Sequence, residues 1–164
     1  MTRSLLIGLL IVSAAQAASA ASFVFRGKIV SREICKDEGL FSQSRCKRAD
    51  LGKNRECLVT VKTDSRENLN AIQIASPAWV EAGDHRRTAL NGRLDRPYLY
   101  KDDFVAYNTK IDRDTSAEVK VSGNRVLGVY VFTKHVHGKN SRGEETRAFN
   151  QYFCANLQPS KRIN

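Results

Sequence analysis

The strongest constraint on the fold is a long, apolar segment near the C-terminus that runs from Arg125 to Cys154. Its first part, Arg125 to His137, is the longest apolar run outside the N-terminus. Val, Tyr, Phe and Thr at this density favour a pleated strand over a helix, and the polar link 138–143, with a glycine at each end, favours a turn. The segment therefore predicts a β-hairpin at the centre of the structure.

A second hairpin is expected directly upstream of the first. Gly123-Asn124 separates two strand-like runs, and glycine accepts the positive φ that a two-residue turn needs. Ser122 then lies opposite Arg125, and three strands form a meander.

This register predicts which face of the meander is buried. If His137 pairs with Glu144, Phe132 lies opposite Phe149, and both rings share one face with the residues that follow from the first turn. That face is apolar: Val119, Val121, Val126, Tyr130, Phe132, Phe149 and Phe153. We therefore expect an aromatic core on it, and we expect the opposite face to need cover only near Cys154.

The rest of the chain is also strand-like, with one exception. Ser76-Pro77 predicts the start of a short helix that ends near Gly83, with Trp79 packed over one end of the sheet. About seven strand candidates with many turn residues indicate an all-β domain. We expect a small Greek-key barrel of the oligonucleotide/oligosaccharide-binding (OB-like) type, or a sandwich, with six to seven antiparallel strands, one short helix and disulfide bonds.

The N-terminus is typical of a secretory signal peptide. Arg3 precedes a short apolar core, and Ala18-Ser19-Ala20 fits the small-residue cleavage pattern. We predict a signal peptide at 1–20, a single β-rich domain at 21–157 and a frayed tail at 158–164. No later apolar run is long enough to cross a membrane, so no stable insertion is expected after cleavage. The predicted location is the periplasm or the extracellular space.

The four cysteines predict two disulfide bonds, because exported chains with an even cysteine count usually oxidise them. Close Cys-x-x-Cys pairs, which zinc sites use, are absent. One pairing joins Cys35 to Cys57 and Cys46 to Cys154. We prefer the other, Cys35–Cys46 with Cys57–Cys154, because directly opposed cysteines on adjacent strands need a demanding geometry that a local loop escapes.

One spacing suggests a metal site. His135 and His137 alternate along a strand and share a face, and Glu144 is a candidate third ligand in the assumed register. The ordinary interpretation is that these are exposed histidines near a hairpin tip.

Charge and motifs limit the function. The net charge of +10 predicts an acidic partner, and cations concentrate at Arg45, Lys47, Arg48, Arg86 and Arg87. The motifs of serine hydrolases, phosphate loops and dinucleotide sites are absent, so an enzyme is not favoured and no cofactor is expected.

We therefore predict a non-enzymatic binding module for an acidic exported protein, acting as an inhibitor, immunity or assembly component. The alternatives are a polyanion, oligonucleotide or oligosaccharide binder and a metal-binding protein. Exposed aromatic rings beside clustered cations would favour a polyanion.

Overall fold

The computed structural model describes residues 21–37, 45–64, 68–94, 96–123 and 125–163, without the side chains of 134–136 and 161–163. They form one ten-stranded antiparallel sheet and one short helix, which confirms the all-β prediction. The elements are β1 (Ser22–Asp37), β2 (Arg45–Arg48), β3 (Glu56–Thr63), β4 (Leu69–Ala75), α1 (Ala78–Glu81), β5 (Ala89–Arg93), β6 (Pro97–Tyr100), β7 (Val105–Lys110), β8 (Thr115–Ser122), β9 (Arg125–Lys139) and β10 (Glu145–Ile163).

The order of strands is a meander, not the predicted Greek key. It reads β5-β4-β3-β1-β10-β9-β8-β7-β6. Strand β2 pairs with the second half of β1, on the edge opposite β10, while β3 pairs with the first half. Apart from β1 beside β10 and β1 beside β3, paired strands follow one another in the sequence. The six or seven strands expected were too few, since β2, β5 and β6 have only four or five residues each and little apolar alternation.

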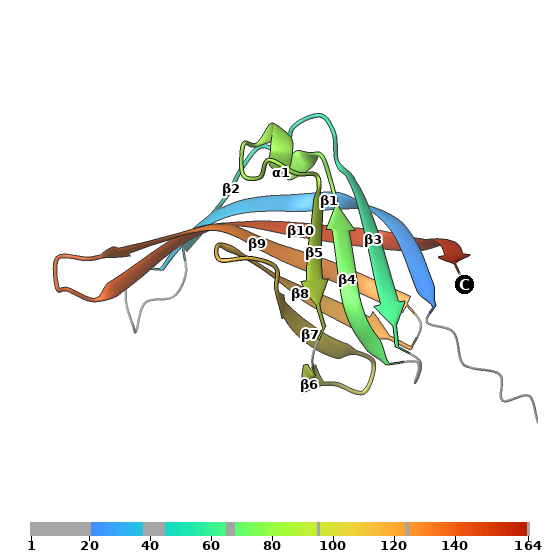
Figure 1. Cartoon of the computed structure of the whole chain (residues 1–164). Helices are drawn as coiled ribbons and strands as arrows, with labels where there is room; N and C mark the ends of the chain where they lie inside the picture. The colour runs from blue at the N-terminus through green and yellow to red at the C-terminus, as the bar shows by residue number, and fades with distance from the viewer. Residues whose placement is uncertain (1–20, 38–44, 65–67, 95, 124, 164) are drawn as a thin grey trace, which may run out of the picture.

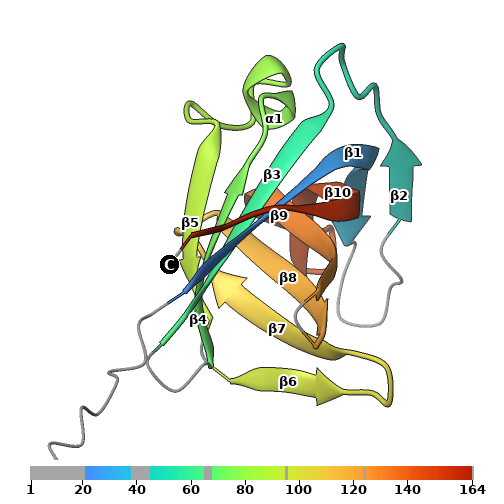
Figure 2. The ribbon, with the colours of Figure 1, turned by 90° about the vertical axis from the view of Figure 1, so that its right-hand side faces the viewer.

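The sheet curls until its two ends approach each other. In Figures 1 and 2, β4 and β5 lie opposite β7 and β8, and the interior of the curl is between them. The Thr109 hydroxyl donates a hydrogen bond to the Arg93 carbonyl at 2.6 Å. A Cβ at Gly92 would lie 2.5 Å from that hydroxyl oxygen, so glycine permits the approach. Among the described residues no backbone ladder closes the curl, and the OB-like barrel is not confirmed.

The enclosed side of the curl is the hydrophobic core, and α1 covers one end of it (Figure 1). Trp79 of α1 is fully buried, contacts Tyr152 edge-on at 6.0 Å, and donates its indole N–H to the carbonyls of Arg87 and Thr88. The expected position of Trp79 over one end of the sheet is confirmed. The largest core contributions come from Phe25, Ile29, Val59, Ile72, Ile74, Trp79, Val119, Val129, Val131 and Tyr152.

The predicted aromatic core is on the wrong face. Ser122 pairs with Arg125 as expected, but a β-bulge at Leu127 then pairs Lys120 with Gly128. One extra residue exchanges the two faces of a strand, because side chains alternate. Val129 and Val131 are therefore buried in the core, while Tyr130 and Phe132 lie half-buried on the outer face.

The last hairpin also has a different register, in which His137 pairs with Arg147 rather than with Glu144. The cause is that Glu144 belongs to the turn: its backbone carbonyl accepts from the Asn140 amide, and its carboxylate accepts from the Asn140 side chain at 2.7 Å.

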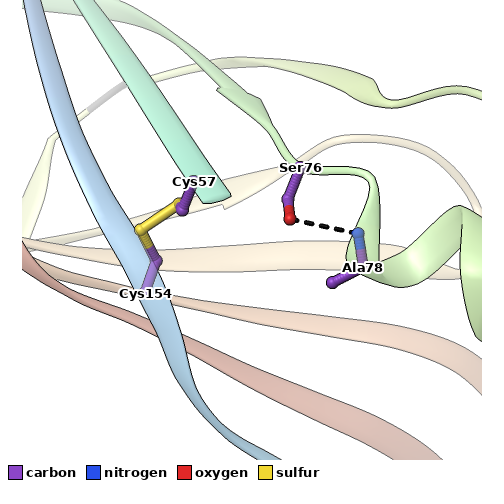
Figure 3. The surroundings of a disulfide bond; sticks show 4 residues. All are labelled: Cys57, Ser76, Ala78 and Cys154. Atoms are coloured by element: carbon purple, nitrogen blue, oxygen red, sulfur yellow. Dashed lines mark hydrogen bonds between the residues drawn. A yellow bond between two sulfur atoms is a disulfide. The ribbon is translucent and has the colours of Figure 1, made fainter. Parts of the chain in front are cut away.

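The preferred disulfide pairing is confirmed, although the reason for preferring it was wrong. Cys35 lies directly opposite Cys46 on adjacent strands β1 and β2, the arrangement that we expected to be avoided. The second bond, Cys57–Cys154, joins β3 to β10 across β1 (Figure 3). Beside it the Ser76 hydroxyl accepts a hydrogen bond from the Ala78 amide at 3.2 Å, although the residue at the cap position of α1 is Pro77, one residue later than expected.

The C-terminal segment is not frayed from residue 158. Strand β10 continues to Ile163, which pairs with Ser22 at the start of β1. Bulges in the ladder accommodate Pro159, which has no N–H to donate. The β-rich unit therefore extends beyond 157. Segment 1–20 lies outside the described residues, and in the described part of the chain no helix has the length and hydropathy needed to cross a membrane.

The two disulfides should contribute unequally to stability. In the chain-entropy model the 97-residue separation of Cys57–Cys154 corresponds to about 4.7 kcal/mol, and the 11-residue separation of Cys35–Cys46 to about 2.8 kcal/mol. We expect the double substitution Cys57→Ala/Cys154→Ala to lower the free energy of unfolding more than Cys35→Ala/Cys46→Ala. Urea unfolding of the two variants and the parent measures this, and equal losses would contradict it.

Candidate functional site

The candidate site lies on an arm that extends beyond the curled part of the sheet. Figure 1 shows the β9–β10 hairpin projecting away from the core, with the end of β1 and β2 beside its base. Strand β8 pairs with β9 only as far as Thr133, so in the described structure 134–139 have β10 as their ladder partner. We define the arm as 31–37, 45–48, 134–139 and 145–151.

The ladder registers decide which side chains share a face of the arm. Opposed residues on antiparallel strands point to the same side. Arg32 pairs with Tyr152, which faces the core, and Ile34 and Lys36 follow at alternate positions. Their partners on β2 and β10 complete what we call the inner arm face: Arg32, Ile34, Lys36, Arg45, Lys47, Ala148 and Asn150.

The inner arm face is basic and has an apolar centre. Lys36, Arg45 and Lys47 are exposed, none of them forms an ion pair within the described part of the chain, and this set of residues holds no carboxylate. Ile34, which lies between Lys36 and Lys47 in the register, is 43% exposed. The apolar side chain of Ile34 is therefore open to water and bordered by cations.

The opposite face of the arm has mixed charge. Glu33 and Asp37 alternate with the inner residues on β1, and Arg48 lies opposite Glu33 in the β1–β2 ladder. Of the predicted cluster 45–48, Arg45 and Lys47 thus belong to the inner arm face and Arg48 does not.

A buried polar network anchors the base of the inner arm face. The Asp84 carboxylate, buried after α1, accepts hydrogen bonds from the Asn150 amide at 2.7 Å and from the Tyr152 hydroxyl. It also pairs with the Arg32 guanidinium at 3.6 Å. Arg32 lies 5.7 Å from the centre of the Tyr152 ring. The network therefore fixes the loop after α1 against the arm.

This anchoring determines where the second predicted cluster lies. Arg86 and Arg87 are exposed and follow Asp84 by two and three residues. They belong to the loop that Asp84 anchors at the base of the inner arm face. Arg32 is already compensated by Asp84.

The outer face of the curl carries the aromatic side chains expected in the core. Tyr130 and Phe153 stack with ring centres 4.3 Å apart, and Phe132 contacts Phe149 edge-on at 6.0 Å. Lys120 lies over Tyr130 but also pairs with Glu118 at 3.4 Å.

Glu118 is engaged a second time on this outer face. Its carboxylate accepts a hydrogen bond from the Tyr98 hydroxyl at 2.7 Å. This hydrogen bond, with a smaller contribution from burial, raises the pKa of Tyr98 to about 12. The cation that the structure places over the rings is therefore already neutralised, and these rings are half-buried in mutual contacts.

The described residues do not test the predicted metal site at His135, His137 and Glu144. His137 is exposed and pairs with Arg147, Glu144 is held by Asn140, and the His135 side chain lies outside the described residues. Among the described residues the one cluster with metal-ligand spacing is Glu33, Cys35 and Cys46, whose two sulfurs form a disulfide. Metal binding by the histidines and Glu144 remains a prediction.

Three important residues were missed at the sequence level: Ile34, Lys36 and Asp84. The alternation of Arg32, Ile34 and Lys36 is visible in the sequence, but no local pattern shows that the strand continues to Asp37. No local pattern distinguishes Asp84 from the other loop carboxylates, since its partners are 66 and 68 residues away.

Removal of the Asp84 carboxylate should destabilise the protein strongly. Asp84→Ala leaves the Arg32 charge partly buried and unpaired, which typically costs about 3–5 kcal/mol. Thermal or urea unfolding measures the loss. The control is Asp103→Ala at an exposed position, for which a change within about 0.5 kcal/mol is expected. Similar small effects of both substitutions would show that the network does not anchor the arm.

The network also predicts a loss of stability at high pH. Burial, and then the hydrogen bond to Asp84, raise the pKa of Tyr152 above its usual value of 10.0. Above pH 10 the unfolded chain ionises this tyrosine while the folded chain keeps its proton, so the unfolded state binds fewer protons and stability falls as pH rises.

We expect the free energy of unfolding to be constant with respect to this group below pH 10 and to decline above it. Tyr152→Phe should have a shallower decline, with a remaining slope from Tyr98 and Tyr107, whose pKa values are also raised. Urea titrations between pH 8 and pH 11 compare the slopes, and identical slopes would contradict the assignment.

Comparison with protein-family models, with curated proteins and with solved structures finds no match for this chain, so the arm and its basic inner face stand on their own geometry.

Proposed function

We propose that this protein is an exported, non-enzymatic binding module that recognises an acidic segment of another exported protein through its inner arm face. The observation that carries the proposal is the placement of three exposed cations around exposed Ile34 on a face with no carboxylate. A group of cations accelerates the encounter with an acidic partner. An apolar centre that loses its water on contact then holds the partner in the complex.

The chemistry of this face favours a protein over a polyanion. Binders of single-stranded nucleic acid combine cations with exposed rings on which bases stack. The inner arm face has an isoleucine at its centre, and its aromatic neighbour Tyr152 is fully buried. The half-buried rings of Tyr130, Phe132 and Phe153 lie on the other side of the sheet, beside a lysine that Glu118 already pairs.

Export rests on two features. The N-terminal 20 residues have the pattern of a signal peptide, and both disulfide bonds favour an oxidising compartment. Inhibitors, immunity proteins and assembly components of such compartments act by presenting a preformed surface, and a sheet stapled at two points supplies one.

The proposal is tested by site-specific photo-cross-linking in the exporting cell. A photoreactive residue at position 34 should give one defined protein adduct, because Ile34 is the apolar centre of the face. Arg45→Glu/Lys47→Glu should lower the yield by about tenfold or more through reversed charge. The matched control Arg26→Glu/Lys62→Glu makes the same change of charge at exposed positions on β1 and β3, and should leave the yield unchanged.

Two outcomes would count against a protein partner. One is an adduct that forms equally well from position 62 or is indifferent to Arg45→Glu/Lys47→Glu. The other is retention on heparin or single-stranded DNA that survives physiological salt and is lost in that double variant, which would identify a polyanion, since phosphate contacts alone weaken steeply with salt.

A further inference from the structure

A second site lies at the end of the curled sheet opposite α1. It is a cavity of about 300 Å³ that opens to solvent between two facing walls of the sheet. One wall comes from β1, β3 and β4, and the other from β7, β8 and β9. The lining residues are Phe23, Val61, Thr63, Asn68, Leu69, Val105, Tyr107, Val121, Gly123 and Val126.

The described lining is uncharged. Among the residues that the structure places around the cavity there is no Asp, Glu, Lys, Arg or His, although charged residues make up 27% of the chain. The groove on the outer face near His137, by contrast, is lined by Lys110, Asp112, Arg113 and Glu118. A charged ligand would lose its hydration in the cavity without gaining a counter-charge, which excludes it on energetic grounds.

The polar groups of the cavity are few and largely engaged. The Thr63 hydroxyl accepts from the Ala21 amide at 3.2 Å and lies 3.4 Å from the Ala21 carbonyl. Tyr107 is half-buried, and this burial raises the pKa of its hydroxyl. What remains is an aliphatic and aromatic surface with the Asn68 side chain at its rim, the usual composition of a small-molecule site.

We propose that this cavity, which we call the mouth, binds one small, uncharged, predominantly apolar molecule of roughly 10–20 non-hydrogen atoms. The mouth lies at the other end of the sheet from the base of the arm, and its occupancy does not depend on the proposed protein partner. Val61, Val121 and Val126 would form the floor, since all three are buried.

A pair of fluorescent probes tests the proposal with the full-length exported protein. N-phenyl-1-naphthylamine is neutral and apolar and becomes fluorescent in an apolar environment. Anilinonaphthalene sulfonate has the same rings with an added negative charge. We expect the neutral probe to bind with 1:1 stoichiometry and to raise the melting temperature. The sulfonate should not displace it, even though the basic surface attracts anions.

Variants locate the bound probe. Leu69→Trp places a larger ring in the mouth from a half-buried position, and Asn68→Trp does so from an exposed one at the rim. Each should weaken binding of the neutral probe at least tenfold. Val30→Trp, at a position on β1 that is 42% exposed and outside the mouth, is the matched control and should bind as the parent does. Circular dichroism confirms that each variant is folded.

Each possible result either supports or overturns the proposal. Saturable binding that is lost in either folded tryptophan variant of the mouth supports the proposal. The proposal is overturned by no fluorescence change with the neutral probe, by equal binding of all variants, or by full displacement with the sulfonate. None of these results bears on cross-linking at position 34, so failure here leaves the proposed function of the arm standing, and the reverse also holds.

Discussion

The antiparallel pairing of β1 with β10 is the interaction on which the rest of the structure depends. Every other ladder except β1 with β3 joins neighbours in the sequence, whereas β1–β10 brings the two ends of the described chain together. The Cys57–Cys154 bond spans this pairing and joins β3 to β10 on the core side. Closing such a long loop is entropically expensive, and the covalent link lowers that cost in the unfolded chain. Without the pairing, two separate meanders would each expose an apolar face.

The same two strands also produce the arm. Residues 22–28 of β1 lie between β3 and β10 and form a wall of the core, whereas beyond Thr133 strand β9 no longer has β8 beside it. Apolar side chains there would have nothing to cover them, and the sequence changes accordingly to alternating Arg, Ile and Lys on one side. The network around Asp84 lies at this transition and engages the inward-facing side chains of Arg32, Asn150 and Tyr152 before the strands leave the core. The basic face is therefore a consequence of strands that continue beyond the part of the sheet that encloses the core.

Turns, the helix and strand character could be predicted from residue types, whereas the register of the long strands could not. The Gly123 turn, the helix after Ser76 and the strand character of the C-terminal third were all predictable from residue types. The bulge at Leu127 has no compositional signal, yet it reverses which face of β9 is buried, and it moved Tyr130 and Phe132 from the predicted core to the outer face. The pairing of Cys35 with Cys46 was right for a reason that the structure does not support. Asp84 could not be recognised, because its partners depend on the β1–β10 pairing.

The mouth and the inner arm face should act independently, although β1 contributes to both. Phe23 lines the mouth, and Ile34 and Lys36 belong to the arm, on one continuous strand. Coupling between two sites requires an element with two arrangements that both ligands bias. Strand β1 is paired with β10 along its length and bordered by both disulfides, so a change at Phe23 has no second arrangement of the ladder to select. The bulges near Ile29 further separate the two ends, because they absorb small shifts before these reach Arg32.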